Sequence, residues 1–147
     1  MRFMMLMIPK GYEKAAADAM PDATAVEAMM EYNKALQQAG VLLALDGLPP
    51  PSMGARVSVS KGARTVTDGP FVETKETLGG YWMIRVGSKQ EAIDWALRCP
   101  ASEQDEYVIE LRQVQELSDF PPEVQRAAAT LPDVQRPPAT RGKEGGR

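Results

Sequence analysis

The densest group of side chains that could do chemistry lies in residues 67–82, which read TDGPFVETKETLGGYW. Asp68, Glu73, Lys75 and Glu76 fall within a span of nine residues, which brings three carboxylates and an amine close together in the chain. A carboxylate whose pKa is raised by burial or by a second carboxylate can act as a general base, and a nearby charge can stabilise the reacting groups. We therefore assign a candidate site here, with Asp68 or Glu73 as the base and Lys75 as the electrostatic stabiliser.

The residues before these charges are typical of a rigid turn. Asp68 and Gly69 supply turn chemistry, and Pro70 fixes its own φ while it favours an extended Gly69. We expect the Asp68 carboxylate to accept backbone N–H groups of the turn, and the ring of Phe71 to be buried. The charged side chains at 73 and 75 would then be held in one orientation, toward a cleft or a dimer partner.

A double glycine and an aromatic residue follow the charges. Gly79 and Gly80 at the start of a strand predict a bulge or a close approach of two backbones. Tyr81, or Tyr107 further along the chain, could supply a hydroxyl donor to the same site. The predicted ligand-binding set is Asp68, Gly69, Pro70, Phe71, Glu73, Lys75 and Tyr81. The alternative from the residues alone is that the segment is a rigid connection whose charges are solvated.

The chain contains no histidine and one cysteine. Histidine general acid–base catalysis, serine–histidine and cysteine–histidine nucleophiles, and imidazole metal ligands are therefore excluded. We expect Cys99 to be a buried thiol, because free cysteine packs as a small apolar residue. No spacing of carboxylates resembles a calcium loop, so we expect neither a metal nor a cofactor.

Length and charge restrict the class of protein further. The 147 residues suit one domain, with 44% hydrophobic and 25% charged residues. The net charge of −3 makes nucleic acid a poor candidate partner, because phosphate binding needs a concentrated basic face. The apolar run at the start, FMMLMI before Pro9, is too short for a signal peptide or a membrane span, so we expect a cytoplasmic protein.

Hydrophobic periodicity predicts an α+β domain over residues 1–117. Capping-box spacing predicts helix starts at Thr24, three residues before Glu27, and at Ser88, three residues before Glu91; Gly40 should end the first helix. The expected strands are 3–8, 41–47, 79–86 and 107–114, with a hairpin of 55–60 and 65–67 joined by KGAR.

Two helices that each bridge a pair of strands favour an antiparallel sheet with both helices on one face. The opposite face then needs a cover. We expect a homodimer, because Val57, Val59 and the WMIRV strand at 82–86 leave more apolar surface than a monomer tolerates.

The composition changes beyond residue 117. Residues 118–147 form a tail rich in proline, glycine and arginine, which lacks a core of its own. The segment PPEVQRAAATL at 121–131 could form at least one helical turn, with proline tolerated at its start.

The stretch DGPFVETKETLGGYW resembles the signature of the DGPF subfamily of YCII-related proteins, whose typical form is DGPFAETKE followed by paired glycines and an aromatic residue. Val72 stands at the alanine position. The segments RFMMLMI, AGVLLALDGLPPP and EAIDWALRCP fit the same family, so the resemblance covers about residues 1–116. It implies a ferredoxin-like fold and a dimeric α+β barrel.

The resemblance implies less about activity than about fold. A histidine–aspartate pair is proposed as catalytic in some relatives, and this chain cannot carry it. Members also resemble a domain encoded beside, or fused to, extracytoplasmic-function sigma factors. Two hypotheses follow, namely a small-molecule site in a cleft beside the DGPF loop, and a non-enzymatic interaction module that docks a transcription-related protein.

Overall fold

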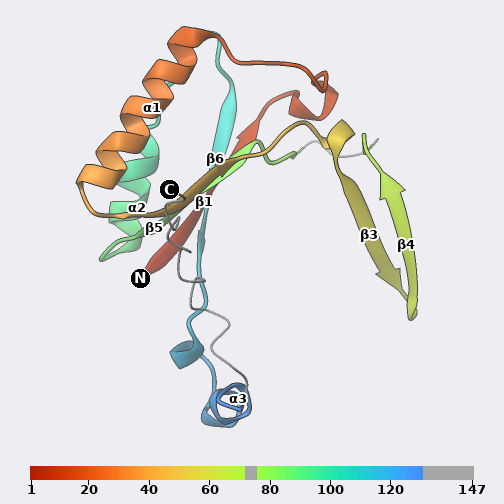
Figure 1. The fold of residues 1–147 in the computed structure, drawn as a ribbon. Helices are drawn as coiled ribbons and strands as arrows, with labels where there is room; N and C mark the ends of the chain where they lie inside the picture. Colours follow the sequence, from red (N-terminus) through yellow and green to blue (C-terminus); the bar gives the residue numbers. More distant parts are fainter. Residues whose placement is uncertain (72–75, 131–147) are drawn as a thin grey trace, which may run out of the picture. The chain divides into compact units, whose positions relative to one another are not determined.

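The computed structural model describes residues 1–71 and 76–130, so Glu73 and Lys75 lie outside the described residues. The chain divides into two units, residues 1–114 and 115–147. Figure 1 shows the course of the chain. No helix of the described part is long and apolar enough to cross a membrane.

The first unit is built on a four-stranded antiparallel sheet. Its central strands bury one face because alternate residues of a strand point the same way. Met5, for example, lies opposite Trp82 on one side and Leu111 on the other. In the order in which they neighbour one another, the strands are β2 (Leu42–Gly47), β5 (Gly80–Arg85), β1 (Arg2–Pro9) and β6 (Tyr107–Gln113).

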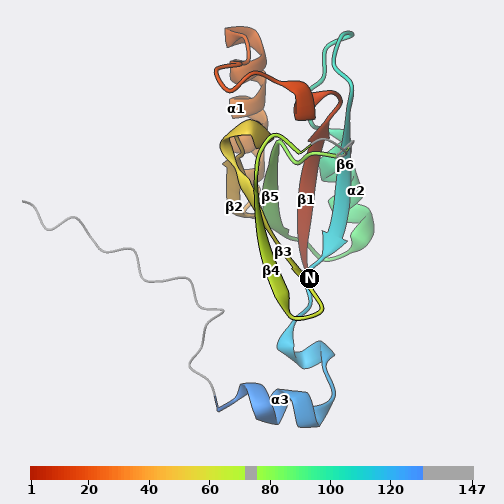
Figure 2. The same ribbon diagram turned by 90° about the vertical axis from the view of Figure 1, so that its right-hand side faces the viewer.

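Helices α1 (Ala23–Gln38) and α2 (Lys89–Leu97) cover one face of this sheet, as Figures 1 and 2 show. The predicted α+β class and the placement of both helices are therefore confirmed. The other face carries Met4 and Leu6, which are half-buried, and β5 residues Tyr81 and Met83 opposite them. We call it the open face.

The helix ends follow capping chemistry, with one correction. Ser88 caps α2 as predicted, since its Oγ accepts the N–H of Glu91 at 3.1 Å. Gly40 follows α1 with φ of 72°, a value that favours glycine. The predicted cap of α1 at Thr24 is wrong. Asp22 caps this helix through Oδ1, which accepts the N–H of Ala25 at 2.8 Å, and Thr24 lies inside the first turn.

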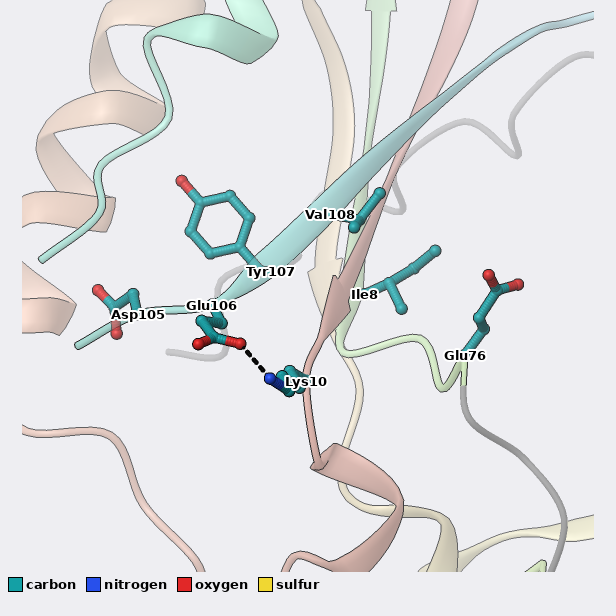
Figure 3. Close-up of a pocket in the computed structure, with 7 residues that line it drawn as sticks. All are labelled: Ile8, Lys10, Glu76, Asp105, Glu106, Tyr107 and Val108. Carbon is teal, nitrogen blue, oxygen red and sulfur yellow. Dashed lines mark hydrogen bonds and ion pairs between the residues drawn. The ribbon is translucent and has the colours of Figure 1, made fainter. Parts of the chain in front are cut away.

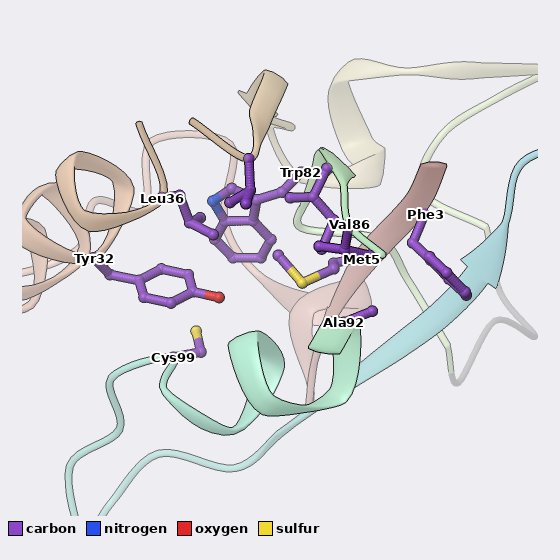
Figure 4. Packing of buried hydrophobic residues seen from close by; sticks show 10 residues of the cluster. Phe3, Met5, Tyr32, Leu36, Trp82, Val86, Ala92 and Cys99 are labelled. Atoms are coloured by element: carbon purple, nitrogen blue, oxygen red, sulfur yellow. The ribbon is translucent and has the colours of Figure 1, made fainter. Parts of the chain in front are cut away.

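The core lies between the helices and the sheet (Figure 4). The rings of Tyr32 and Trp82 meet edge to face with centroids 5.7 Å apart, and the indole N–H of Trp82 donates to Asn33 Oδ1 at 2.8 Å. Cys99 is buried as predicted, and burial raises the pKa of its thiol. That thiol is therefore protonated and inert near neutral pH.

Our expectation that the WMIRV strand leaves a bare apolar surface needs correction. Trp82, Ile84 and Val86 are all buried in the core with the residues of the two helices. Only the alternate residues of β5 reach the open face, because neighbouring side chains of a strand point to opposite sides.

The predicted hairpin is a separate two-stranded sheet of β3 (Ala55–Ser60) and β4 (Ala63–Asp68). Its turn is shorter than the KGAR segment that we expected. Lys61 and Gly62 have φ values of 50° and 79° and form the turn alone, so Ala63 already belongs to the second strand. Two such left-handed residues are what a tight hairpin turn requires.

The second unit contains a short 3₁₀ turn, η3 (Leu117–Asp119), and helix α3 (Pro122–Ala128). The predicted helical turn within 121–131 is therefore confirmed. Gln125 Nε2 donates to the carbonyl of Phe120 at 2.7 Å, which stabilises the start of α3.

Candidate functional site

The turn after β4 is held by a close approach of two backbones. The N–H of Gly69 donates to the carbonyl of Gly54 at 2.8 Å, and the Gly69–Pro70 peptide bond is cis. A Cβ atom at Gly69 would lie 1.7 Å from the carbonyl oxygen of Pro51, in the 3₁₀ turn η2 (Pro51–Met53). Only glycine fits there, so the turn is anchored to the segment that precedes the hairpin.

Phe71 is half-buried, so the prediction of a buried ring is only partly right. The guanidinium carbon of Arg56 lies 4.0 Å from the centroid of its ring, in a cation–π contact. The ring therefore packs on a side chain from the root of the hairpin, which leaves part of it in water.

Asp68 does not have the role that we predicted within the described residues. Its side chain is exposed, and no hydrogen bond joins its carboxylate to a backbone N–H of residues 1–71 or 76–130. The N–H of Gly69 stabilises the turn instead.

The double glycine is explained by close packing. A Cβ atom at Gly79 would lie 2.8 Å from Cγ of Pro9, and one at Gly80 would lie 2.8 Å from the carbonyl oxygen of Asp46. The N–H of Gly79 donates to the carbonyl of Met7, also at 2.8 Å. The end of the motif is thereby held between β1 and β2, which supports the close approach that we predicted as one of two explanations.

The two candidate tyrosines both have acceptors already. Tyr81 lies on the open face, where its hydroxyl donates to Asp46 Oδ2 at 2.7 Å and this hydrogen bond raises the tyrosine pKa. The hydroxyl of Tyr107 reaches the carbonyl oxygens of Cys99 at 3.1 Å and Pro100 at 3.0 Å. Burial raises the pKa of Tyr107. Both hydroxyls therefore stabilise the fold in this structure.

A groove of about 650 Å³ opens at the end of the sheet where β1 finishes and β6 begins. Figure 3 shows Ile8 and Val108 side by side, with Glu76 to one side of them and Lys10 and Glu106 to the other. Glu76 is the first described residue after positions 72–75, so the groove adjoins the motif segment. Its lining residues are Ile8, Lys10, Glu76, Asp105, Glu106, Tyr107 and Val108.

The charges of the groove are held at its rim. Lys10 Nζ and Glu106 Oε2 form an ion pair at 2.5 Å, and the hydrogen bond to Glu106 raises the pKa of Lys10. Asp105 Oδ2 accepts the N–H of Ser102 at 2.7 Å, and this backbone bond lowers the pKa of Asp105. Near neutral pH the Lys10 amine is therefore protonated and the Asp105 carboxylate is ionised, in the same groove as the apolar side chains of Ile8 and Val108.

Two polar atoms near the motif are buried with no hydrogen-bond partner in the described part of the chain, namely Thr77 Oγ1 and Glu13 Oε2. Thr77 is 8% exposed, and Glu13 lies in the 3₁₀ turn η1 (Tyr12–Lys14). A buried polar group without a partner costs free energy, so such atoms call for an explanation. No three potential metal ligands cluster among residues 1–71 and 76–130.

The predicted site residues are not all brought together. Tyr107 lines the groove, whereas Asp68, Gly69, Pro70, Phe71 and Tyr81 do not. Sequence reasoning missed Lys10 and Glu106 as groove residues. The available signal was that each stands at the end of a predicted strand, but only the β1–β6 register, which places Pro9 opposite Tyr107, brings them together.

The family model of the YCII-related domain matches residues 1–118. The chain belongs to the YCII-related family. An uncharacterised protein of Rhizobium meliloti (strain 1021) is 42% identical to this YCII-related chain over 59 residues. The match covers 40% of this chain and 48% of the relative, so it spans about half of the relative's length.

Proposed function

We propose that this YCII-related chain is a homodimeric domain that binds a small molecule in the groove beside the motif segment. The observation that carries the proposal is the groove itself, because its lining combines an apolar floor with charged groups from three separate segments. Most ligand sites have this composition, in which apolar contacts supply affinity and a few polar groups set orientation. Glu76, the last residue of the DGPF-like segment 68–76, lines this groove, which supports a link between the segment and the site.

The ligand class follows from the lining. Ile8 and Val108 favour an apolar portion, while Glu76 and Asp105 favour an amine or another positively charged group. Lys10 and Glu106 are exposed, so their ion pair can open at little cost and offer one charge of each sign to a ligand. A small molecule with an amine and an apolar body suits these contacts.

Binding is better supported than catalysis. Asp105, whose pKa is lowered, is a weak base, and the Tyr107 hydroxyl already donates to backbone carbonyls. The chain has no histidine, so it cannot use the histidine–aspartate chemistry proposed for relatives.

The homodimer is supported by the open face of the sheet. Met4 and Leu6 of β1 and Met83 of β5 are only half-buried there, and none of the three lines the groove. Such a row of apolar side chains on a sheet favours association with a second sheet. We propose that the open faces of two copies pack together, as the dimeric barrel expected from the DGPF resemblance requires.

The second candidate function is a non-enzymatic interaction module that docks a transcription-related protein in the cytoplasm. The observation that favours it is the β3–β4 hairpin, whose twelve strand residues are all exposed. One buried thiol, Cys99, is also compatible with a reducing compartment.

A thermal-shift screen distinguishes the two candidates, because a ligand that binds the folded state raises the melting temperature. The library should contain amines, amino acids and carboxylic acids, tested on the wild type, Lys10→Ala and Glu76→Gln. Lys34→Ala, an exposed lysine on α1, is the matched control. We expect hits that are lost in the two groove variants and kept in the control. The small-molecule proposal would be contradicted if no compound raised the melting temperature, or if the compounds that did so gave the same shift in both groove variants.

A further inference from the structure

The hairpin of residues 55–68, which we call the arm, has no helix or sheet of the described residues packed over its strands. All six residues of β3 and all six of β4 are exposed, and neither strand pairs with the four-stranded sheet. An isolated two-stranded hairpin is marginally stable in water, because it buries little apolar surface. The arm therefore needs a partner surface to become a stable element.

Most apolar side chains of the arm share one face, which also carries Arg64, opposite Val59, and Asp68, opposite Ala55. Val57 lies opposite Val66, and Val59 follows two residues after Val57, so the three side chains share one face. They are 66%, 68% and 63% exposed, respectively. We call Val57, Val59 and Val66 the valine strip. The opposite face is polar, with Ser58 opposite Thr65.

The root of the arm is rigid. Gly69 packs on the backbone of Pro51 and bonds to Gly54, so the two ends of the arm are tied to each other. Arg56 stacks on Phe71 directly beyond the second strand. A motif that holds the arm in one direction reduces the entropy lost when a partner binds it. The Asp-Gly-Pro-Phe sequence thus has a clear mechanical role.

The direction of the arm indicates which surface covers the valine strip. Figures 1 and 2 show the arm on the side of the four-stranded sheet opposite to α1 and α2, in front of the open face. A second copy that packs on the open face therefore lies next to the arm. The apolar residues of that open face, among them Met4 and Leu6, match the valine strip in character.

The distribution of net charge also favours a second copy of this chain as the partner of the arm. The arm carries Arg56, Lys61 and Arg64 against Asp68, a net charge of +2. Residues 1–114 contain 12 lysines and arginines and 15 aspartates and glutamates, a net charge of −3, so the part of this unit outside the arm carries −5. Two bodies of −5 repel each other, whereas a basic arm of one copy is attracted to the acidic body of the other.

We propose that the arm is a dimerisation arm, whose valine strip packs against the body of a second copy of this chain beside its open face. The inference rests on the homodimer proposed above, and it adds an element that each subunit contributes to the interface. The polar face of the arm, with Ser58 and Thr65, stays in water.

The test is a pair of matched double variants measured by sedimentation equilibrium. Val57→Asp with Val66→Asp places two carboxylates on the valine strip, and Ser58→Asp with Thr65→Asp places two on the opposite face at the neighbouring register position. We expect the dissociation constant of the dimer to rise at least tenfold in the valine variant and to change less than threefold in the control. Circular dichroism should be unchanged in both, because all four positions are exposed.

The outcomes separate this inference from the proposed homodimer. A wild type that is monomeric at micromolar concentration overturns both. A dimeric wild type whose valine variant keeps the same dissociation constant, or whose control weakens equally, overturns the arm alone. As a second measurement, a photocrosslinking amino acid can replace Val59, and nitrogen-14 and nitrogen-15 samples of this variant can be mixed so that their subunits exchange. Mass spectrometry should then find cross-linked peptide pairs in which one peptide carries each isotope. Peptides of one label only would contradict the proposal.

Discussion

Strands β5 and β3 each carry two large apolar residues at alternate positions, and the environments of these residues are opposite. Trp82 and Ile84 of β5 are 6% and 0% exposed, whereas Val57 and Val59 of β3 are 66% and 63% exposed. β5 is a central strand with two helices over one face, while β3 belongs to a hairpin that pairs with no other strand of residues 1–71 and 76–130. Alternation thus determines which side chains share a face, and a covering layer determines whether that face is buried.

The same contrast between covered and uncovered strand faces separates the residues that stabilise the fold from the residues that are available for binding. The buried face of the sheet holds the core, and the groove and the valine strip lie where no helix covers the strands. The DGPF turn belongs to the second region, because its contacts are with Pro51, Gly54 and Arg56 at the root of the arm. The following variants test this division, from the largest effect to the smallest.

Ile84→Ala should have the largest effect, because it leaves a cavity in the core beneath the helices. We expect a loss of about 2–5 kcal/mol in the free energy of unfolding, measured by urea denaturation. The matched variant Val59→Ala in the arm should cost less than about 0.5 kcal/mol where the chain is monomeric. Equal costs for the two would show that the arm is packed as tightly as the core, contrary to the comparison.

Gly69→Ala should come next, since its Cβ would lie 1.7 Å from the carbonyl oxygen of Pro51. The backbone at the root of the arm must shift, and we expect a cost of about 1–3 kcal/mol. Gly47→Ala is the control, because a Cβ there meets nothing within 4 Å, and it should change stability by at most about 0.5 kcal/mol. If Gly69→Ala and Gly47→Ala have the same melting temperature, the close approach of Gly69 to Pro51 does not restrict the residue type at position 69.

Tyr107→Phe should have a moderate effect. It removes the donor shared by the carbonyls of Cys99 and Pro100, and we expect a cost of about 0.5–1.5 kcal/mol. Tyr81→Phe is its counterpart on the open face, where the exposed Asp46 carboxylate can turn to water. Chemical denaturation should therefore show a smaller loss for Tyr81→Phe, and the reverse order would contradict the assignment of Tyr107 to the fold.

The smallest effect is expected for Asp105, as a contribution to the pH dependence of the free energy of unfolding. Its folded-state pKa is lowered by the Ser102 N–H, so the bond stabilises the fold above the unfolded pKa of about 3.9. This stability is lost as the pH falls through the lower, folded-state pKa. Carbon-13 NMR should give a midpoint for Asp105 below 3.8, the ordinary value. Asp105→Asn should remove this part of the acid dependence, and a midpoint above 3.8 would contradict the bond.

Local signals along the chain predicted most of the fold and less of the candidate site. Ser88 caps its helix through a bond to a residue three positions away, and Gly40 ends a helix through its own φ, so each is readable from neighbours. Asp22 rather than Thr24 caps α1, because two nearby residues offer the same chemistry and a capping pattern cannot rank them. For the groove, the position of Lys10 and Glu106 near the ends of predicted strands was the only signal, and it could not pair two residues that are 96 apart in the chain.

The sequence by itself determined the strands, the two covering helices, the existence of the hairpin but not its two-residue turn, and a buried Cys99, because backbone periodicity and capping act over a few residues. Tertiary structure alone decided that the ring of Phe71 packs on Arg56, that Gly69 packs on Pro51 and that β1 and β6 end together at a groove. These contacts depend on strand register and on the presence or absence of a covering layer. Both arise only when segments distant in the chain pack together.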